Sequence, residues 1–328
     1  MNRKVYLIAA LLIAMVAALI NLKMFYGTRT VSFSPSQHLW RVNIVINIKG
    51  KGARAKVRLT LPRRNERQVI YNEHFEDDEL AFSVQEKPDT GNRMGYWRCE
   101  LLEGSRTIQY FFSAQLKSQP FSISQDDRLS KTPLAKYPQG FEIWLNPSAH
   151  IQSKSPEIKK LLKKIIGKEK RTDLAVRKIY DFIRAEVQYR SEKGSKDASE
   201  TVKQLVADCG GQARLFVALC RATGIPSRMV GGLIVNESVK NITHVWAENY
   251  IGDRWIPFDT TNNYYAYLPN HYVELYRDDV ALIGHSGLSK IEYFFSISRE
   301  PMPPVDNPWS LYVLPIHFQS SVKFLLLI

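Results

Sequence analysis

The sequence is poor in cysteine, with only three in 328 residues. So few thiols exclude a disulfide-rich scaffold. If one helix carries Cys209 and Cys220, a rise of about 1.5 Å per residue separates them by roughly 16 Å, far beyond disulfide reach. Cys99 falls in a predicted strand and is interpreted as a packed residue. Thiol chemistry is therefore expected from an unpaired cysteine, and Cys209 is the candidate.

Metal-binding and nucleic-acid-binding patterns are also missing from the sequence. No cysteine or acidic residue lies at a spacing typical of a zinc site from His38, His74, His150, His271, His285 or His317. We therefore predict no metal and no cofactor. The formal net charge of +13 is spread through residues 49–68 and 154–178, without a nucleic-acid-binding motif. This charge suits an anionic membrane or cell-envelope surface, or simply solubility, and we predict no nucleic-acid partner.

Long apolar runs occur only near the two ends of the chain. Val5 to Ile20 is unbroken and follows Arg3 and Lys4. With the apolar residues up to Tyr26 it approaches the length that spans a bilayer. A cleaved signal peptide is the alternative, but no small-residue cleavage motif follows, so we favour a signal anchor over residues 1–27. The basic flank predicts a single-pass protein of the inner (cytoplasmic) membrane, with its globular part in the periplasm of a bacterium.

Residues 28–150 have the period of β-strands. Val42, Ile44, Ile46 and Ile48 alternate with polar residues, and further short strands and a hairpin over 97–116 follow. Short strands at this spacing predict an all-β sandwich. A rigid spacer or a partner-docking module is a better interpretation of this domain than a second active site.

Helical patterns begin after residue 150. Ser155 as N-cap, Pro156 at the first position and a stop at Gly167 predict a short amphipathic helix, and a second helix is predicted over 172–189. The first helix carries lysines on one face. That face contacts either a membrane surface or, as we prefer, solvent.

Cys209 lies in Asp208-Cys209-Gly210-Gly211, directly before apolar residues at helical spacing. Asp208 is a plausible N-cap, which puts Cys209 in the first turn of a helix. Unpaired N–H groups and the helix dipole stabilise a thiolate there. The two glycines leave room for a substrate carbonyl. This environment indicates a nucleophile.

A histidine and a carboxylate follow at positions that could serve this nucleophile. His244 is at the entrance of a predicted strand, and the Gly252-Asp253 turn leads into a returning strand that ends at Asp259. Hairpin geometry places Asp259 opposite His244, close enough to orient the imidazole. A thiol, a base and an orienting carboxylate together predict nucleophilic catalysis.

Residues 175–262 resemble the transglutaminase-like (papain-like) superfamily. The resemblance lies in Asp208-Cys209-Gly210-Gly211-Gln212-Ala213, in Gly224-Ile225-Pro226-Ser227-Arg228, in His244-Val245-Trp246-Ala247-Glu248, and in Trp255-Ile256-Pro257-Phe258-Asp259. It implies a papain-like α+β fold with Cys209 as nucleophile, His244 as base and Asp259 as orienting acid. Gln188, Tyr189 and Trp246 are the candidate oxyanion or substrate-positioning residues. The chemistry varies within the superfamily: transfer to an amine, hydrolysis, or none.

The flanks resemble a second, bacterial family. Residues 28–120 and 264–328 look like proteins in which a transglutaminase-like ectodomain, often degenerate and inactive, is fused to seven transmembrane helices. The apolar run that ends the chain resembles the start of a membrane helix. We therefore expect an anchor (1–27), a β-sandwich (28–150), a transglutaminase-like domain (151–265) and a C-terminal extension that enters a membrane segment (266–328).

Two functions are compatible with these patterns. The first is a membrane-anchored thiol acyl-transfer enzyme that acts on a peptide or protein through a thioester, more as a peptidase or amidase than as a crosslinker. The second is a catalytically silent periplasmic module that binds peptides or a multi-helix membrane-protein partner.

Overall fold

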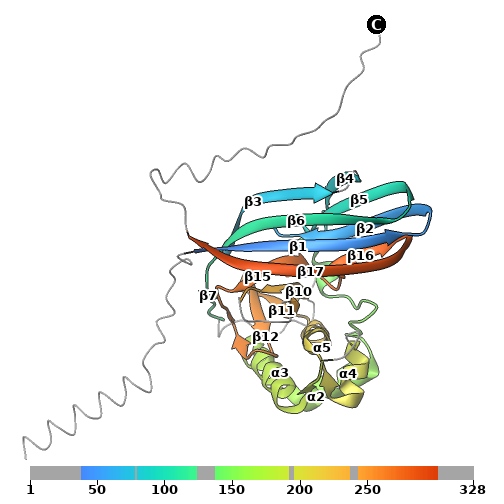
Figure 1. Cartoon of the computed structure of the whole chain (residues 1–328). Helices are drawn as coiled ribbons and strands as arrows, with labels where there is room; N and C mark the ends of the chain where they lie inside the picture. The colour runs from blue at the N-terminus through green and yellow to red at the C-terminus, as the bar shows by residue number, and fades with distance from the viewer. Residues whose placement is uncertain (1–37, 78–79, 124–136, 192–195, 237–242, 302–328) are drawn as a thin grey trace, which may run out of the picture.

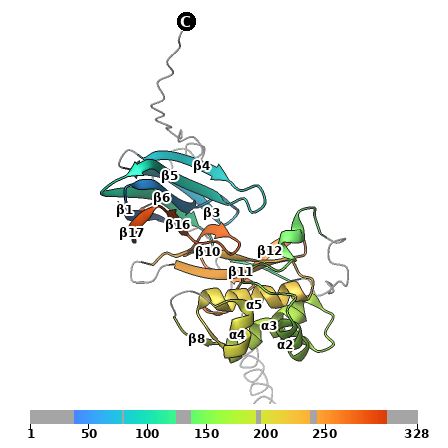
Figure 2. The same ribbon diagram turned by 90° about the vertical axis from the view of Figure 1, so that its right-hand side faces the viewer.

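The structure is a computed structural model that describes residues 38–77, 80–123, 137–191, 196–236 and 243–301. A β-sandwich lies on one side of a five-stranded sheet, and a group of helices lies on the other side of that sheet (Figures 1 and 2). The expected membrane anchor and the apolar C-terminal run lie outside the described residues. Within the described ranges, no helix has the length and apolar character needed to cross a membrane.

The β-sandwich is built from two four-stranded antiparallel sheets, in the orders β17-β1-β6-β3 and β16-β2-β5-β4. The predicted alternation from Val42 to Ile48 is present, and these apolar side chains are buried in a core that both sheets share. The strands are β1 (His38–Gly50), β2 (Ala53–Leu61), β3 (Gln68–Asp77), β4 (Ala81–Glu86), β5 (Arg93–Leu102), β6 (Ser105–Leu116), β16 (Ile283–Ser286) and β17 (Leu288–Pro301).

Two strands of the sandwich come from the C-terminal part of the chain. Strand β17 pairs along the whole of β1, from His38 opposite Pro301 onward, and β16 pairs with β2. The sandwich is therefore discontinuous in sequence, whereas the sequence analysis assigned these residues to a separate extension beginning at 266. Ile291, Phe295 and Ile297 of β17 pack against the sandwich core, whereas the adjacent Tyr293 and Phe294 are both exposed, so the strand is only partly buried.

The central domain has a five-stranded sheet in the order β13-β12-β11-β10-β15, with helices on one side. Helix α5 packs against β10 and β11 and is buried along most of its length. The strands of the sheet are β10 (Ser227–Ile234), β11 (Thr243–Ile251), β12 (Arg254–Asp259), β13 (Tyr264–Tyr265) and β15 (Tyr272–Arg277). The helices are η2 (Phe141–Trp144), α2 (Pro156–Ile166), α3 (Thr172–Glu186), α4 (Ala198–Gln204) and α5 (Cys209–Ala222).

Two short strand pairs complete the domain. Strand β7 (Gln119–Pro120) pairs with β14 (Tyr267–Leu268), and β8 (Gln188–Tyr189) runs parallel to β9 (Val206–Ala207). The Ser155 cap, Pro156 start and Gly167 end of α2 are confirmed. The second predicted helix ends at Glu186, so Gln188 and Tyr189 belong to a strand and not to a helix end.

Candidate active site

Cys209 is the first residue of α5. The Asp208 side chain accepts a hydrogen bond from the Gly211 backbone N–H at 2.8 Å, which confirms the predicted N-cap. Strand β9 ends directly before this cap and fixes the direction in which the chain enters the helix. Cys209 is partly exposed, so its sulfur lies where unpaired helix N–H groups stabilise negative charge and where a substrate has access.

His244 and Asp259 form a buried pair at the ends of two neighbouring strands. His244 Nε2 lies 2.7 Å from Asp259 Oδ2. Because Ala247 pairs with Phe258, the register continues to Asp259 opposite Trp246, and Asp259 is a diagonal neighbour of His244. The register expected from the hairpin sequence placed Asp259 directly opposite His244. The diagonal offset still brings the two side chains together.

The imidazole contacts the thiol as well as the carboxylate. Burial alone would lower the pKa of His244, but hydrogen bonds to Asp259 and to Cys209 raise it to about 10. Burial would raise the pKa of Asp259, but the hydrogen bond and charge of His244 lower it. Since Asp259 occupies Nε2, Nδ1 is the ring nitrogen left for Cys209. These contacts favour the protonated form of the His244 ring and the ionised form of the Asp259 carboxyl.

These pKa shifts predict how stability depends on pH. The folded pKa of His244 exceeds its ordinary 6.5, so its contribution is complete below pH 6.5 and is lost as the pH rises toward about 10. The folded pKa of Asp259 lies below 3.8, so its contribution is complete above pH 3.8 and is lost on further acidification. The free energy of unfolding of the wild type minus that of Asp259→Asn should therefore be largest between pH 3.8 and 6.5. Urea denaturation across pH measures it, and a difference that grows toward pH 10 would contradict the assignment.

Two residues that the sequence analysis missed hold the carboxylate. The Tyr272 hydroxyl donates to Asp259 Oδ2 at 2.8 Å. The Asn262 side-chain amide lies 3.2 Å from the same oxygen and from His244 Nε2, and donates to the Tyr272 hydroxyl at 2.7 Å. The backbone N–H groups of Thr261 and Asn262 donate to Asp259 Oδ1, each at 3.0 Å. The pattern Asp-x-x-Asn at residues 259–262 is typical of such a turn and could have predicted it. Nothing in the sequence points to Tyr272.

The three candidate positioning residues occupy different places. Gln188 and Tyr189 are exposed on β8, beside the strand that precedes Asp208. Burial, then the nearby Cys209 and Asp208, raise the pKa of Tyr189. Trp246 is buried instead and stacks beside His244, with ring centroids 6.5 Å apart. Its Nε1 has no hydrogen-bond partner among the described residues.

Tyr276 is a second tyrosine near the thiol. Burial and then the charge of Cys209 raise its pKa, and its ring lies over Gly231, where an added Cβ would come within 1.9 Å of the ring. Gly231 is therefore required for Tyr276 to cross strand β10. Within the described ranges, no three cysteine, histidine or acidic side chains gather where they could hold a metal ion.

Comparisons with known proteins place the sequence in a family. Residues 159–260, which include all three triad residues, match the transglutaminase-like superfamily. Residues 30–205, more than half of the chain, match the family described as inactive transglutaminase fused to 7 transmembrane helices. No curated protein matches the sequence.

One solved structure supports the fold, and a second serves for comparison only. A "putative cysteine protease" from Cytophaga hutchinsonii is 21% identical and has a TM-score of 0.66, with 82% of this chain and 92% of that chain covered. A "putative protease" from Parabacteroides distasonis is 12% identical over 65% of this chain and 42% of that chain, with a TM-score of 0.29. The central domain has the transglutaminase-like, papain-like fold, and the chain belongs to the family of inactive transglutaminases fused to seven transmembrane helices.

Proposed function

We propose that this protein is a thiol acyl-transfer enzyme that cleaves a carboxamide or peptide bond through a thioester on Cys209. The observation that carries the proposal is the complete set of contacts around His244, with Asp259 2.7 Å from Nε2 and a hydrogen bond to the partly exposed Cys209. A pair of this kind supplies both the thiolate nucleophile and the acid for the leaving group.

The reaction follows from these positions. The Cys209 thiolate attacks the carbonyl carbon, and the His244 imidazolium gives its proton to the departing ammonia or amine as the C–N bond breaks. The neutral imidazole then takes a proton from water, which attacks the thioester. The C–S bond breaks, the carboxylic acid leaves, and the thiolate and imidazolium are restored. The first-turn N–H of Cys209 is one oxyanion donor, and Gln188 or Tyr189 beside it supplies the second. Hydrolysis is preferred over transfer to an amine because water needs no binding site of its own.

An ester without substrate specificity tests the acylation step. With p-nitrophenyl acetate, the Cys209 thiolate should take the acetyl group and release p-nitrophenolate in a burst of about one equivalent per chain. The burst should disappear in Cys209→Ala and persist in Cys99→Ala, which removes the other partly exposed thiol. Stopped-flow absorbance measures it, and mass spectrometry locates the acetyl group. Acetylation without preference for Cys209 would contradict the proposal.

A catalytically silent binding module is the second candidate, because the family to which the chain belongs is described as inactive. On that account the triad is a structural remnant. The burst experiment separates the two functions, since a silent module gives no burst even though its fold is intact.

We further propose that residues 1–27 anchor the protein in the inner membrane and that the β-sandwich holds the catalytic domain on the periplasmic side. The fusion to transmembrane helices in this family supports membrane association. Protease added to spheroplasts should digest the globular part of the full chain. Protection from the protease until the membrane is broken would overturn this orientation.

A further inference from the structure

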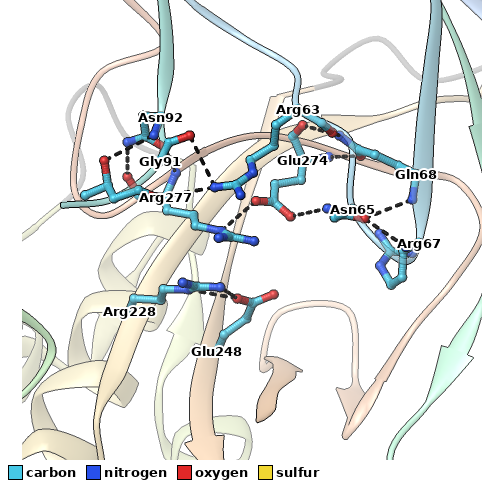
Figure 3. A network of polar contacts seen from close by, with 11 residues as sticks. Arg63, Asn65, Arg67, Gln68, Gly91, Asn92, Arg228, Glu248, Glu274 and Arg277 are labelled. Carbon is cyan, nitrogen blue, oxygen red and sulfur yellow. Dashed lines mark hydrogen bonds and ion pairs between the residues drawn. The ribbon is translucent and has the colours of Figure 1, made fainter. Parts of the chain in front are cut away.

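The outer edge of β15 is covered by side chains of the β-sandwich instead of by another strand. β15 is the last strand of the five-stranded sheet. The Gln68 amide donates to the Glu274 carbonyl and accepts from its N–H, both at 2.8 Å. The Asn92 amide does the same at Arg277, at 2.6 and 2.7 Å. Each amide satisfies a backbone pair that a neighbouring strand would otherwise satisfy, and the two domains are thereby joined along one strand (Figure 3).

Arg67 fixes the beginning of the same strand. Its guanidinium is buried and donates to the Tyr272 carbonyl at 2.9 Å, to the Lys117 carbonyl at 2.7 Å and to the Pro269 carbonyl at 3.3 Å. The Asn65 side chain shapes this loop by accepting from the backbone N–H of Arg67 and donating to the Glu274 carboxylate, both at 2.8 Å. The start of β15 is thus tied to the sandwich by one multidentate side chain.

Tyr272 connects this joint to the catalytic carboxylate. Its carbonyl accepts from Arg67, and its hydroxyl donates to Asp259 Oδ2 at 2.8 Å. The ring is 1% exposed and packs edge-on against Trp246, with centroids 5.4 Å apart. A buried, packed side chain keeps one orientation, so a shift of its backbone moves its hydroxyl. A displacement of the loop that carries Arg67 would therefore move Tyr272 and, through its hydroxyl, Asp259.

We propose that the β-sandwich is a positioning element of the active site. Asn65 holds Arg67, and Arg67 fixes the position of Tyr272. Tyr272 in turn fixes the position of the Asp259 carboxylate, which orients His244. Arg67 and Tyr272 act on the site through Asp259, so they are positioning residues and not catalytic ones. This inference rests on the proposed function, and it assigns to the sandwich a role in catalysis beyond that of a spacer.

A double-mutant cycle on the full chain in detergent tests the connection. The readout is the rate at which iodoacetamide alkylates Cys209, followed by mass spectrometry from pH 5 to 9. Tyr272→Phe removes only the hydroxyl and should slow alkylation at pH 6 by about tenfold, the usual effect of losing one hydrogen bond to a charged group. Arg67→Lys cannot reach three carbonyls and should slow it several-fold. In the Tyr272→Phe background, Arg67→Lys should have no further effect.

A matched control removes a different contact between the β-sandwich and strand β15. Asn92→Ala breaks two hydrogen bonds at the far end of β15, so it should lower the melting temperature and leave the alkylation profile unchanged. If Arg67→Lys does not fold, Asn65→Ala loosens the Arg67 loop while keeping the Arg67 guanidinium and takes its place in the cycle. The proposal would be overturned if the fold-decreases in alkylation rate caused by Arg67→Lys and Tyr272→Phe multiplied in the double variant. It would also be overturned if Asn92→Ala slowed alkylation as much as Arg67→Lys does.

The pKa of His244, measured by NMR in the same variants, separates this proposal from the proposed function. If wild-type Cys209 reacts no faster than Cys99, the enzymatic function fails. The coupling is then tested by whether Arg67→Lys lowers the pKa of His244 only when the Tyr272 hydroxyl is present. If Cys209 is reactive but the effects of Arg67→Lys and Tyr272→Phe are independent, only the proposed coupling between Arg67 and Tyr272 is wrong.

Discussion

Replacing His244 with alanine is expected to slow the alkylation of Cys209 at pH 6 by roughly 10- to 100-fold. The pKa of His244 is raised to about 10 through its hydrogen bonds to Asp259 and Cys209, despite its burial, so the ring carries a proton at pH 6 and stabilises the thiolate beside it. Cysteines paired with an imidazolium react as thiolates at a pH where an ordinary thiol is protonated. Removal of the ring leaves only the helix terminus to stabilise the anion.

His271 provides the matched control for that substitution. It is another partly buried histidine of the same domain, and burial followed by the charge of Arg67 lowers its pKa. His271→Ala should therefore leave the alkylation rate at pH 6 unchanged. Site-resolved mass spectrometry after short exposure to iodoacetamide measures both rates. Equal rates in the wild type and His244→Ala would show that the imidazole does not activate the thiol.

Glu248→Ala is expected to destabilise the protein by about 3–5 kcal/mol, the usual cost of leaving one member of a buried ion pair unpaired. The Glu248 carboxylate accepts from Arg228 Nε and Nη2 at 2.9 and 2.6 Å, and the guanidinium carbon lies 3.7 Å from the Trp255 ring centroid. Burial lowers the pKa of Arg228 to about 10, so its charge persists at neutral pH. Without the carboxylate, the buried Arg228 cation loses both of these hydrogen bonds.

An exposed pair serves as the comparison. Arg177 and Asp181 form an i, i+4 ion pair on α3 at 2.7 Å, with both side chains about half exposed. Asp181→Ala should cost less than about 0.5 kcal/mol because water and salt screen such pairs. Urea denaturation of the two variants at pH 7 measures both. A cost for Glu248→Ala below about 1 kcal/mol would mean that this buried pair adds little to the free energy of unfolding.

Features specified by short-range sequence signals could be predicted. Asp208 caps α5, and Ser155 with Pro156 starts α2. The hairpin between β11 and β12 turns at Gly252 and Asp253, whose backbone φ angles are 58° and 61°. Each feature depends on residues only a few positions apart, and Cys209, His244 and Asp259 were proposed as site residues from signals of the same kind.

Features that depend on distant pairings could not be predicted. Strand β17 pairs with a strand some 250 positions earlier in the chain, and no local pattern encodes that register. Tyr272 reaches Asp259 only because β15 folds back beside β10. The amides of Gln68 and Asn92 look like ordinary polar residues until the edge of β15 meets them. Sequence patterns therefore indicated the chemistry of the site, while its support became visible only in the structure.

The central claim is that Cys209 is an activated nucleophile, and the protein contains its own references for testing it. Cys99 is partly exposed like Cys209, whereas Cys220 is fully buried, which raises its pKa to about 12. Wild-type protein is exposed briefly to iodoacetamide at pH 6, and labelling is measured at each cysteine. We expect Cys209 to be labelled at least tenfold faster than Cys99, and Cys220 to remain unlabelled. Labelling of Cys209 at the rate of Cys99 would contradict the claim.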